Sequence, residues 1–357
     1  MLFDEVGRLH VLDASAKLVT VIDVDGSFMG TVGGPGDGPG ELASPTGMAR
    51  DPNGALIVFD QARRNFVSYD SMGTYVGSVP LDVDVAAPVG SLAIDVTGRV
   101  FSSLDDRVQA AGVDGPVRRD LVLYAVNPGS ANEAVYSGWW PPTPEVRELT
   151  PEETGGMRVR LAPVVGFHPG LHGAPLPDGR LAIVDSTDYR VRFVGGSPPT
   201  PALTRPVAPL QVDGALQDAE RDRRIRLVED APPRLMRSDS DGARAEVANE
   251  AVLRLELARI DGMGFHDVVP VIQRLAADPL GRLWVQRNAG APGRPGPIDV
   301  VRPGGEYLGT LDANRFRMPD AFGPHGRIAH IVIDDFGATR VNVGRLITPN
   351  GAVKPGG

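Results

Sequence analysis

The architecture follows from residues 54–60, Gly54-Ala55-Leu56-Ile57-Val58-Phe59-Asp60, in which a glycine leads into alternating side chains and an acidic end. Related phrases occur six times, beginning at Gly7, Gly54, Gly98, Gly179, Gly281 and Gly326. The steps between successive glycines are 47, 44, 81, 102 and 45 residues. Three of these steps match the roughly 40 to 50 residues of one four-stranded propeller blade. The two longer steps contain no further copy, and they predict single blades that carry insertions.

The turn before this phrase has the chemistry of a tight hairpin. In Asp51-Pro52-Asn53-Gly54 the proline sets φ, and the Asn-Gly pair tolerates positive φ. The run that follows is rich in branched and aromatic side chains, as in a half-buried strand. We therefore predict an all-β fold, a six-bladed β-propeller of four-stranded antiparallel blades that occupies residues 1–357 as a single domain. Closing the ring requires residues 1–6 to meet a blade built from residues 315–347, and we expect that closure to be imperfect.

Two insertions are predicted. Residues 105–165 form an irregular insertion that is polar and rich in turn-forming residues. Residues 211–261 form a helical insertion before the fifth blade, because residues 214–230 and 243–260 are dense in Ala, Leu, Glu and Arg. We expect this helical insertion to act as a lid or rim cap on the central funnel.

Composition narrows the classes of partner. The net charge of −9 excludes nucleic acid as an expected partner, because binding to phosphates depends on clustered Lys and Arg. No apolar run approaches the roughly 18 residues that span a bilayer, so no membrane span is predicted. The chain has no cysteine, which excludes thiolate zinc sites and cysteine nucleophiles. Residues 1–7 carry no export signal. The protein is predicted to be periplasmic or secreted with its signal absent from this chain, or else cytoplasmic.

The first two blades resemble a known repeat. The glycine-rich run at residues 33–42, the segment Ser44-Pro45-Thr46-Gly47 and residues 51–60 together resemble the NHL-type repeat of six-bladed β-propellers. Residues 278–285 are similar to bacterial propellers in which a helical insertion precedes a blade beginning Asp-Pro-x-Gly-Arg-Leu-Trp-Val. The resemblance implies the fold. Propellers of similar outline include metal-dependent lactonases and organophosphate hydrolases, whose calcium ligands have no residue-by-residue match here.

Three histidines are candidates for a metal site. His168 and His172 lie at the start of the predicted inner strand of the fourth blade, and His266 lies at the start of that of the fifth. Leading ends of inner strands gather at one mouth of a propeller channel, where ligands bind. Three neutral imidazoles with an open fourth position are the ligand set of a hydrolytic zinc site. We therefore predict a divalent metal at this mouth, zinc rather than calcium.

Other polar residues have candidate roles around such a metal. Asp267 would fix the tautomer of a ligating imidazole or take the proton of the bound water. Arg274 and Arg50, on inner strands, would hold an anionic or polarised oxygen. In the alternative interpretation, the candidate histidines only cap a turn and pack in the channel wall. His10 is interpreted as a packing residue, because its place in the repeat is apolar in other copies.

Two functions remain open. The first is a metal-assisted hydrolase of small esters or phosphoesters, similar to phosphotriesterases and lactonases, that acts on a small-molecule substrate at the central funnel. The second is a non-catalytic propeller scaffold of the cell envelope that binds a peptide, glycan or partner protein. Because one fold hosts both, only the site can decide between them.

Overall fold

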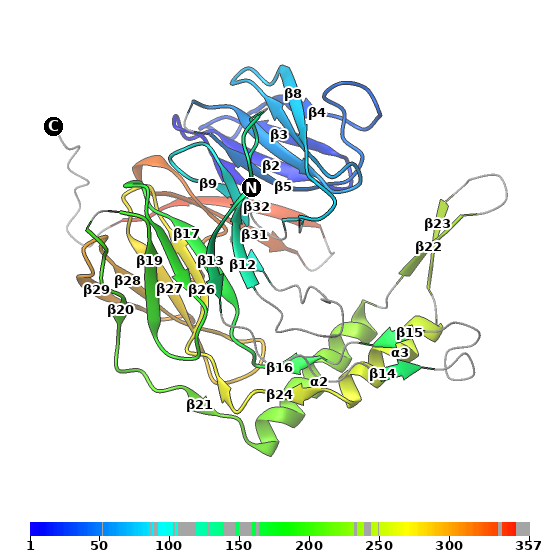
Figure 1. Cartoon of the computed structure of the whole chain (residues 1–357), viewed down its shortest axis with the longest axis vertical. Helices are drawn as coiled ribbons and strands as arrows, with labels where there is room; N and C mark the ends of the chain where they lie inside the picture. Colours follow the sequence, from blue (N-terminus) through cyan, green and yellow to red (C-terminus); the bar gives the residue numbers. More distant parts are fainter. Residues whose placement is uncertain are drawn as a thin grey trace.

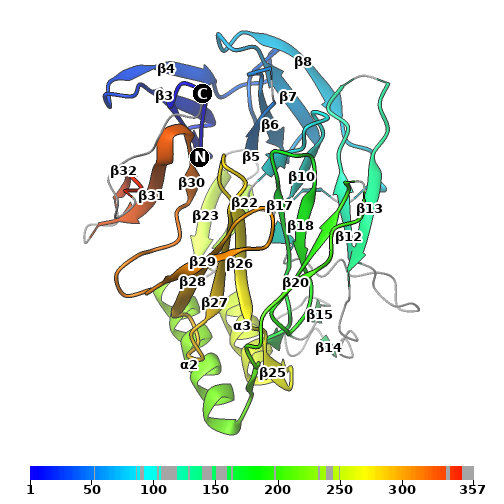
Figure 2. The same cartoon turned by 90° about the vertical axis from the view of Figure 1, so that its left-hand side faces the viewer.

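The chain forms a ring of β-sheets with two helices at one edge (Figures 1 and 2). The computed structural model describes residues 1–51, 53–85, 87–88, 92–102, 104–105, 119–127, 129–138, 147–149, 159–161, 164–196, 198–231, 234–238, 244–248, 250–334 and 338–347. Statements about the structure refer to these residues.

Four of the blades are antiparallel sheets of four successive strands. Blade 1 consists of β1 (Leu2–Phe3), β2 (Leu9–Asp13), β3 (Leu18–Ile22) and β4 (Phe28–Gly33). Blade 2 consists of β5 (Pro45–Arg50), β6 (Leu56–Asp60), β7 (Asn65–Tyr69) and β8 (Tyr75–Pro80). Blade 4 consists of β17 (Leu171–Pro175), β18 (Leu181–Val184), β19 (Arg190–Val194) and β20 (Leu203–Thr204). Blade 5 consists of β26 (Ile272–Ala277), β27 (Leu283–Asn288), β28 (Pro295–Val301) and β29 (Tyr307–Leu311).

The other two blades depart from this pattern. Blade 3 joins the pair β9 (Leu92–Ile94) and β10 (Val100–Ser102) to the pair β12 (Arg119–Leu123) and β13 (Glu133–Gly138). The link is a bridge between Val100 and Tyr124. Blade 6 has three strands, β30 (Ala321–Phe322), β31 (Arg327–Ile333) and β32 (Thr339–Arg345), so within the described residues β32 has a strand on one side only.

The predicted insertion over residues 105–165 is narrower in the structure. Its β12 and β13 belong to blade 3, because backbone pairing with β10 draws them into the ring. The short β11 (Leu104–Asp105) pairs with the inner strand β17 of blade 4, and β14 (Arg147–Leu149) pairs with β15 (Val159–Leu161). Within this insertion, residues 106–118, 128, 139–146, 150–158 and 162–163 lie outside the described part of the chain.

The core is divided among the interfaces between neighbouring blades. Six clusters of buried apolar side chains lie one in each interface of the described ring. The clusters contain, in order around the ring, Val19 with Tyr69, Phe66 with Val100, Phe101 with Ile183, Val184 with Ile272, Ile298 with Met318, and Ala329 with Leu9. Each blade therefore packs on two neighbours, and the ring has six blades, as predicted.

The recurring Gly-Arg phrase has a local cause. In four blades an aspartate lies three residues before the glycine: Asp4, Asp51, Asp95 and Asp278. In Asp278, Oδ1 accepts hydrogen bonds from the backbone N–H groups of Leu280 and Arg282, both at 3.0 Å. In three of these blades the arginine after the glycine pairs with the same carboxylate, at 2.6 Å for Arg282 and Asp278. Together with the positive φ of the glycine, +74° for Gly281, these contacts close the hairpin between the first two strands of a blade.

The ring closes through side chains. Within the described residues, no strand is shared between blade 1 and blade 6. Arg327 spans the junction, with Nη1 donating to the carbonyl oxygen of Gly7 at 2.8 Å and Nη2 donating to that of Val24 at 2.6 Å. The ring of Phe3 packs against Gly323, where an added Cβ would lie 2.6 Å from the phenyl Cγ. The predicted meeting of the chain's first and last segments is therefore observed, without strand exchange.

The second insertion is helical, with a β-hairpin between its helices. Helix α2 (Gly214–Asp230) matches the predicted stretch, and Asp213 caps it by accepting from the N–H of Leu216 at 2.9 Å. Helix α3 (Glu250–Asp261) begins later than predicted, because β23 (Arg244–Ala248) pairs with β22 (Arg234–Ser238). Pairing thus overrides the helical propensity of these residues.

The helices lie beside the leading ends of blades 4 and 5. The segment β24 (Gly264–Phe265), which follows α3, pairs in parallel with β16 (Val165–Gly166). The short β21 (Leu210–Gln211) before α2 pairs with β25 (Val268–Val269). Figures 1 and 2 show both helices at the lower edge of the molecule, beyond these blades. Neither helix has the length and apolar character to cross a bilayer, and the same holds for every described helix.

Candidate functional site

The segments that carry two of the candidate histidines lie side by side. The parallel pair of β16 and β24 places Gly166 opposite Phe265, and the N–H of His266 donates to the carbonyl oxygen of Gly166 at 2.9 Å. His168 follows β16, and its Nδ1 lies 3.2 Å from the carbonyl oxygen of Pro169. The expected approach of blades 4 and 5 at their leading ends is therefore present.

The three imidazoles do not share a metal-binding arrangement. His172 is buried on β17, opposite Val184 and Leu104 in the neighbouring strands. Among the described residues, which include all three histidines, no group of three or more His, Cys, Asp or Glu could hold a metal ion. The zinc ion therefore stays a prediction.

The other predicted site residues, Asp267, Arg274 and Arg50, make contacts in different parts of the structure. Asp267 uses its backbone oxygen to accept from the N–H of Val212 at 2.9 Å. Arg274 is engaged with blade 6, since Nη2 donates to the carbonyl oxygen of Pro319 at 3.1 Å and Nη1 lies 3.5 Å from Asp320. Burial lowers the pKa of Arg274, and the charge of Asp320 opposes this. Arg50, by contrast, lines two cavities.

The first cavity is the axial opening at the trailing ends of the inner strands. Its volume is about 490 Å³, and every blade contributes to it, through Phe3, Arg50, Ile94, Pro175, Ala277 and Phe322. We expected the ligand site at the opposite, leading ends. The carboxylates of this opening that belong to the repeat, such as Asp51 and Asp95, are directed to the N–H groups of their own turns. They stabilise the hairpins that surround the axis.

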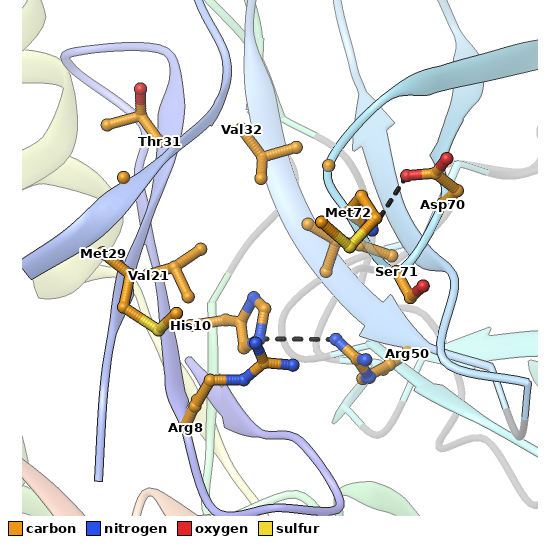
Figure 3. A pocket seen from close by; sticks show the side chains of 13 residues that line it. Arg8, His10, Val21, Met29, Thr31, Val32, Arg50, Asp70, Ser71 and Met72 are labelled. Atoms are coloured by element: carbon orange, nitrogen blue, oxygen red, sulfur yellow. Dashed lines mark hydrogen bonds between the residues drawn. The ribbon is translucent and has the colours of Figure 1, made fainter.

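The second cavity is a pocket of about 290 Å³ between blades 1 and 2. Its polar end is formed by Arg8, His10 and Arg50, and its sides include Val21, Val32, Met29 and Met72 (Figure 3). Strands β2, β3 and β4 supply one wall, and β5 with the turn at residues 70–73 supplies the other. Gly73 fits closely against Val32, where an added Cβ would lie 2.8 Å from Cγ2. The contact between this turn and β4 therefore limits the pocket on one side.

A chain of charged and polar groups forms the polar end. Arg8 Nε donates to Asp4 Oδ2 at 2.6 Å, and the same carboxylate oxygen lies 3.6 Å from His10 Nε2. Arg50 Nη1 lies 3.3 Å from His10 Nε2. Burial opposes the ionisation of Asp4, but hydrogen bonds from Arg8 and the charges of Arg8 and Arg50 outweigh it and lower its pKa. Asp4 is therefore an anion that balances Arg8.

His10 is neutral, and its two polar neighbours favour different tautomers. Burial, followed by the charge of Arg50, lowers the pKa of His10, while Asp4 acts in the opposite direction. A guanidinium group can only donate, so the contact with Arg50 at 3.3 Å favours the tautomer with its proton on Nδ1, whereas the Asp4 carboxylate at 3.6 Å favours a proton on Nε2. His10 is 5% exposed, and its Nδ1 has no hydrogen-bond partner among the described residues. The imidazole extends into the space that Val21, Val32 and Met72 surround (Figure 3).

Arg50 has a similar unused donor. Its Nε is buried and has no hydrogen-bond partner within the described part of the chain. A buried donor without an acceptor costs about 1 to 3 kcal/mol. Both buried donors belong to residues that line the same pocket.

His10 is a residue of this pocket that the sequence analysis did not include among the candidate site residues. We interpreted it as a packing residue because the corresponding position in other copies holds a large apolar side chain, such as Ile57, Phe101 or Trp284. The signal was present in the sequence. A titratable residue at a position where other copies of the repeat have apolar side chains is unusual, and this could have marked His10 as a candidate. Its partner Arg50 was predicted to hold an anionic or polarised oxygen, and this role stays a prediction for a residue that lines the pocket.

Comparison with known proteins agrees on the fold. A protein-family model described as a 6-bladed beta-propeller matches residues 2–96. The match covers blades 1 and 2 and the first strand of blade 3, where the repeat is clearest. No curated protein matches the chain in sequence.

Several solved structures resemble the chain distantly. A catalytically inactive virginiamycin B lyase from Staphylococcus aureus with quinupristin is 10% identical, with a TM-score of 0.38 over 95% of this chain and 81% of that one. A Bacteroides fragilis protein described as exported is 12% identical, with a TM-score of 0.45 over 93% and 80% of the two chains. A gluconolactonase from Xanthomonas campestris is 14% identical, with a TM-score of 0.38 over 95% and 80%. Likenesses at this level carry no argument about what this chain binds or catalyses.

Proposed function

We propose that this chain is a ligand-binding β-propeller whose pocket between blades 1 and 2 holds a small anionic ligand. The ring supplies a rigid platform, because each blade is packed on two neighbours. One observation carries the proposal. The guanidinium group of Arg50 lines the pocket, and among the described contacts it has no carboxylate partner, since it contacts the His10 ring instead. An anionic oxygen in the pocket would face the charge of Arg50.

Titration with acetate, followed by the NMR signals of the His10 ring nitrogens, tests this function. Acetate carries a carboxylate and a single methyl group, and its binding should shift the Nδ1 signal in a saturable way. In Arg50→Met the saturable shift should be lost. Arg302→Met is the matched control, because it removes an exposed guanidinium that pairs with Glu306 on a turn of blade 5. It should bind acetate as the parent protein does.

The opposite results are equally clear. An absence of saturable shift, or an equal shift in Arg50→Met, would show that the pocket does not bind anions. The folded state of each variant is checked by the dispersion of its amide signals.

Metal-assisted hydrolysis of small esters or phosphoesters is the second candidate. The parallel pairing of β16 and β24 favours it, because this pairing brings the segments of His168 and His266 side by side. Elemental analysis of protein purified without added metal should then find about one zinc per chain, as a single site requires. Ester turnover should be lost with a chelator and in His172→Ala. Metal-free protein with unchanged turnover would exclude this candidate.

The cellular location of the protein and the identity of its ligand also stay predictions. A periplasmic or secreted protein would meet small ligands, peptides or glycans in the cell envelope. Fractionation of cells that produce the protein from its own gene distinguishes this location from the cytoplasm.

A further inference from the structure

The structure assigns a ligand class to the pocket between blades 1 and 2. We propose an amphiphilic monoanion, a carboxylate on an aliphatic chain. The carboxylate would lie against Arg50 and His10, and the chain would lie along Val21, Met29 and Met72. This inference rests on the proposed function, since it concerns the same site. Beyond the proposed function, the inference specifies that the ligand has an apolar chain and a single negative charge.

The charge balance at the polar end favours a monoanion. Arg8 is neutralised by Asp4 at 2.6 Å, and His10 is neutral. Arg50 is then the one cation of this cluster without a carboxylate partner, because its contact at 3.3 Å is to the His10 ring. One surplus positive charge matches one carboxylate better than a dianionic phosphate.

Two further carboxylates near the pocket are directed to backbone N–H groups and not to Arg50. Asp70 also lines the pocket, and its Oδ1 accepts from the N–H groups of Met72 at 2.9 Å and Thr74 at 2.8 Å. Figure 3 shows the bond to Met72. Asp51, next to Arg50 in the chain, directs its Oδ1 in the same way to the N–H groups of Asn53 and Ala55. Both side chains are therefore held at turns.

The rest of the pocket is apolar and open at its rim. Val21 and Val32 line the side, and Leu56 contributes from blade 2. Met29 is 50% exposed and Met72 is 86% exposed, although both line the cavity. Phe28, adjacent to Met29, is exposed as well. Apolar side chains gathered at the mouth of a pocket indicate a surface that an apolar group covers.

Methionine suits a ligand chain of variable shape. Its unbranched thioether adapts to different apolar partners and is frequent at binding surfaces. The two methionines come from different blades, Met29 from β4 and Met72 from the turn at residues 70–73. A chain that lies between them would bury apolar surface of both blades at once.

A homologous series of straight-chain carboxylates, from acetate through butyrate and hexanoate to octanoate, tests the inference. Affinity is measured by calorimetry or by the NMR shift of His10. Each added methylene should tighten binding by about fourfold until the chain leaves the pocket. The double variant Met29→Ser, Met72→Ser should flatten this dependence on chain length. Leu280→Ser, which removes an exposed apolar side chain from a turn of blade 5, is the matched control.

The outcomes separate this inference from the function on which it rests. If acetate and octanoate bind equally, the apolar chain is wrong and the anion site stands. If no member of the series binds, both proposals fail. If octanoate binds as well to Arg50→Met as to the parent protein, the contact is apolar adhesion and the proposed head-group site is wrong. Octyl phosphate that binds tighter than octanoate would overturn the preference for a monoanion.

Discussion

Trp284 Nε1 donates to Asp278 Oδ2 at 3.0 Å, so the first aspartate of the blade 5 hairpin bonds to the indole on its second strand. The same buried carboxylate accepts from Arg282 Nε at 2.6 Å. A single side chain thus fixes the turn, an arginine and a large core residue. Its counterpart in blade 2, Asp51, is followed by Ala55 where other copies have arginine, and it bonds only to backbone N–H groups of its turn among the described contacts.

Replacement of Asp278 by alanine should lower the free energy of unfolding by about 3 kcal/mol, because Arg282 and the buried indole N–H of Trp284 both lose their acceptor. Asp51→Ala removes two turn hydrogen bonds and should cost about 1 kcal/mol. Urea denaturation of both variants measures the difference. Equal losses would show that the arginine and indole contacts add nothing to the turn.

The buried carboxylate of Asp299 offers a second comparison. It pairs with Arg205 Nη1 at 2.5 Å and lies 3.4 Å from Arg287 Nε, and it also accepts from the hydroxyl of Thr310. Asp299→Ala leaves two guanidinium groups between blades 4 and 5 without this partner, and it should cost about 3 to 5 kcal/mol. Glu306→Ala, which breaks the exposed pair with Arg302, should cost less than about 1 kcal/mol. Thermal unfolding of the two variants checks the ranking.

The junction of blades 1 and 6 should open first when Arg327 is removed. Arg327→Ala loses two charged hydrogen bonds, to the backbones of Gly7 and Val24, which are worth about 1.5 to 3 kcal/mol each. Amide hydrogen exchange should accelerate in β1, β2 and β31 and change little in blades 3 and 4. Uniform acceleration around the ring would contradict a local role.

Stability should depend on pH through His10. Its folded pKa lies below its ordinary value, so the unfolded chain binds a proton there at higher pH than the folded chain does. The free energy of unfolding should therefore decrease as the pH falls below about 6.5, and this decrease should end below the folded pKa. His10→Phe should reduce the dependence. It should not abolish it, because burial also lowers the pKa of His330. An identical pH profile in His10→Phe would disprove the assignment.

The ring was predictable because its repeat is local. A glycine with positive φ, a turn and an alternating strand lie within about ten residues, and the copy at Gly54 shows them all. The third and fourth strands of blade 3 were not predictable in this way. They join the ring through the Val100 to Tyr124 bridge, which connects residues far apart in sequence. Nothing in the local pattern of residues 119–138 indicates that pairing.

The sequence indicates the ring more directly than it indicates the pocket between blades 1 and 2. Arg50 was identified from its place on an inner strand, and it lies in a pocket. His10 was interpreted as a packing residue. The repeat indicates the position of a residue on its strand, but it does not indicate which side chain of the neighbouring blade that residue contacts. Contacts across a blade interface depend on the stacking of two sheets, which the sequence of either blade does not contain. The same limit applies to the histidines of blades 4 and 5, whose backbones meet without forming a ligand group.

The three-stranded sixth blade has a consequence for association. The outward main chain of β32 has no strand beside it in the described part of the molecule, and Val343 on that strand is exposed. A free sheet edge is a template for main-chain hydrogen bonding. At high concentration, molecules would meet edge to edge along β32. An extended peptide could lie there as a fourth strand without displacing any blade.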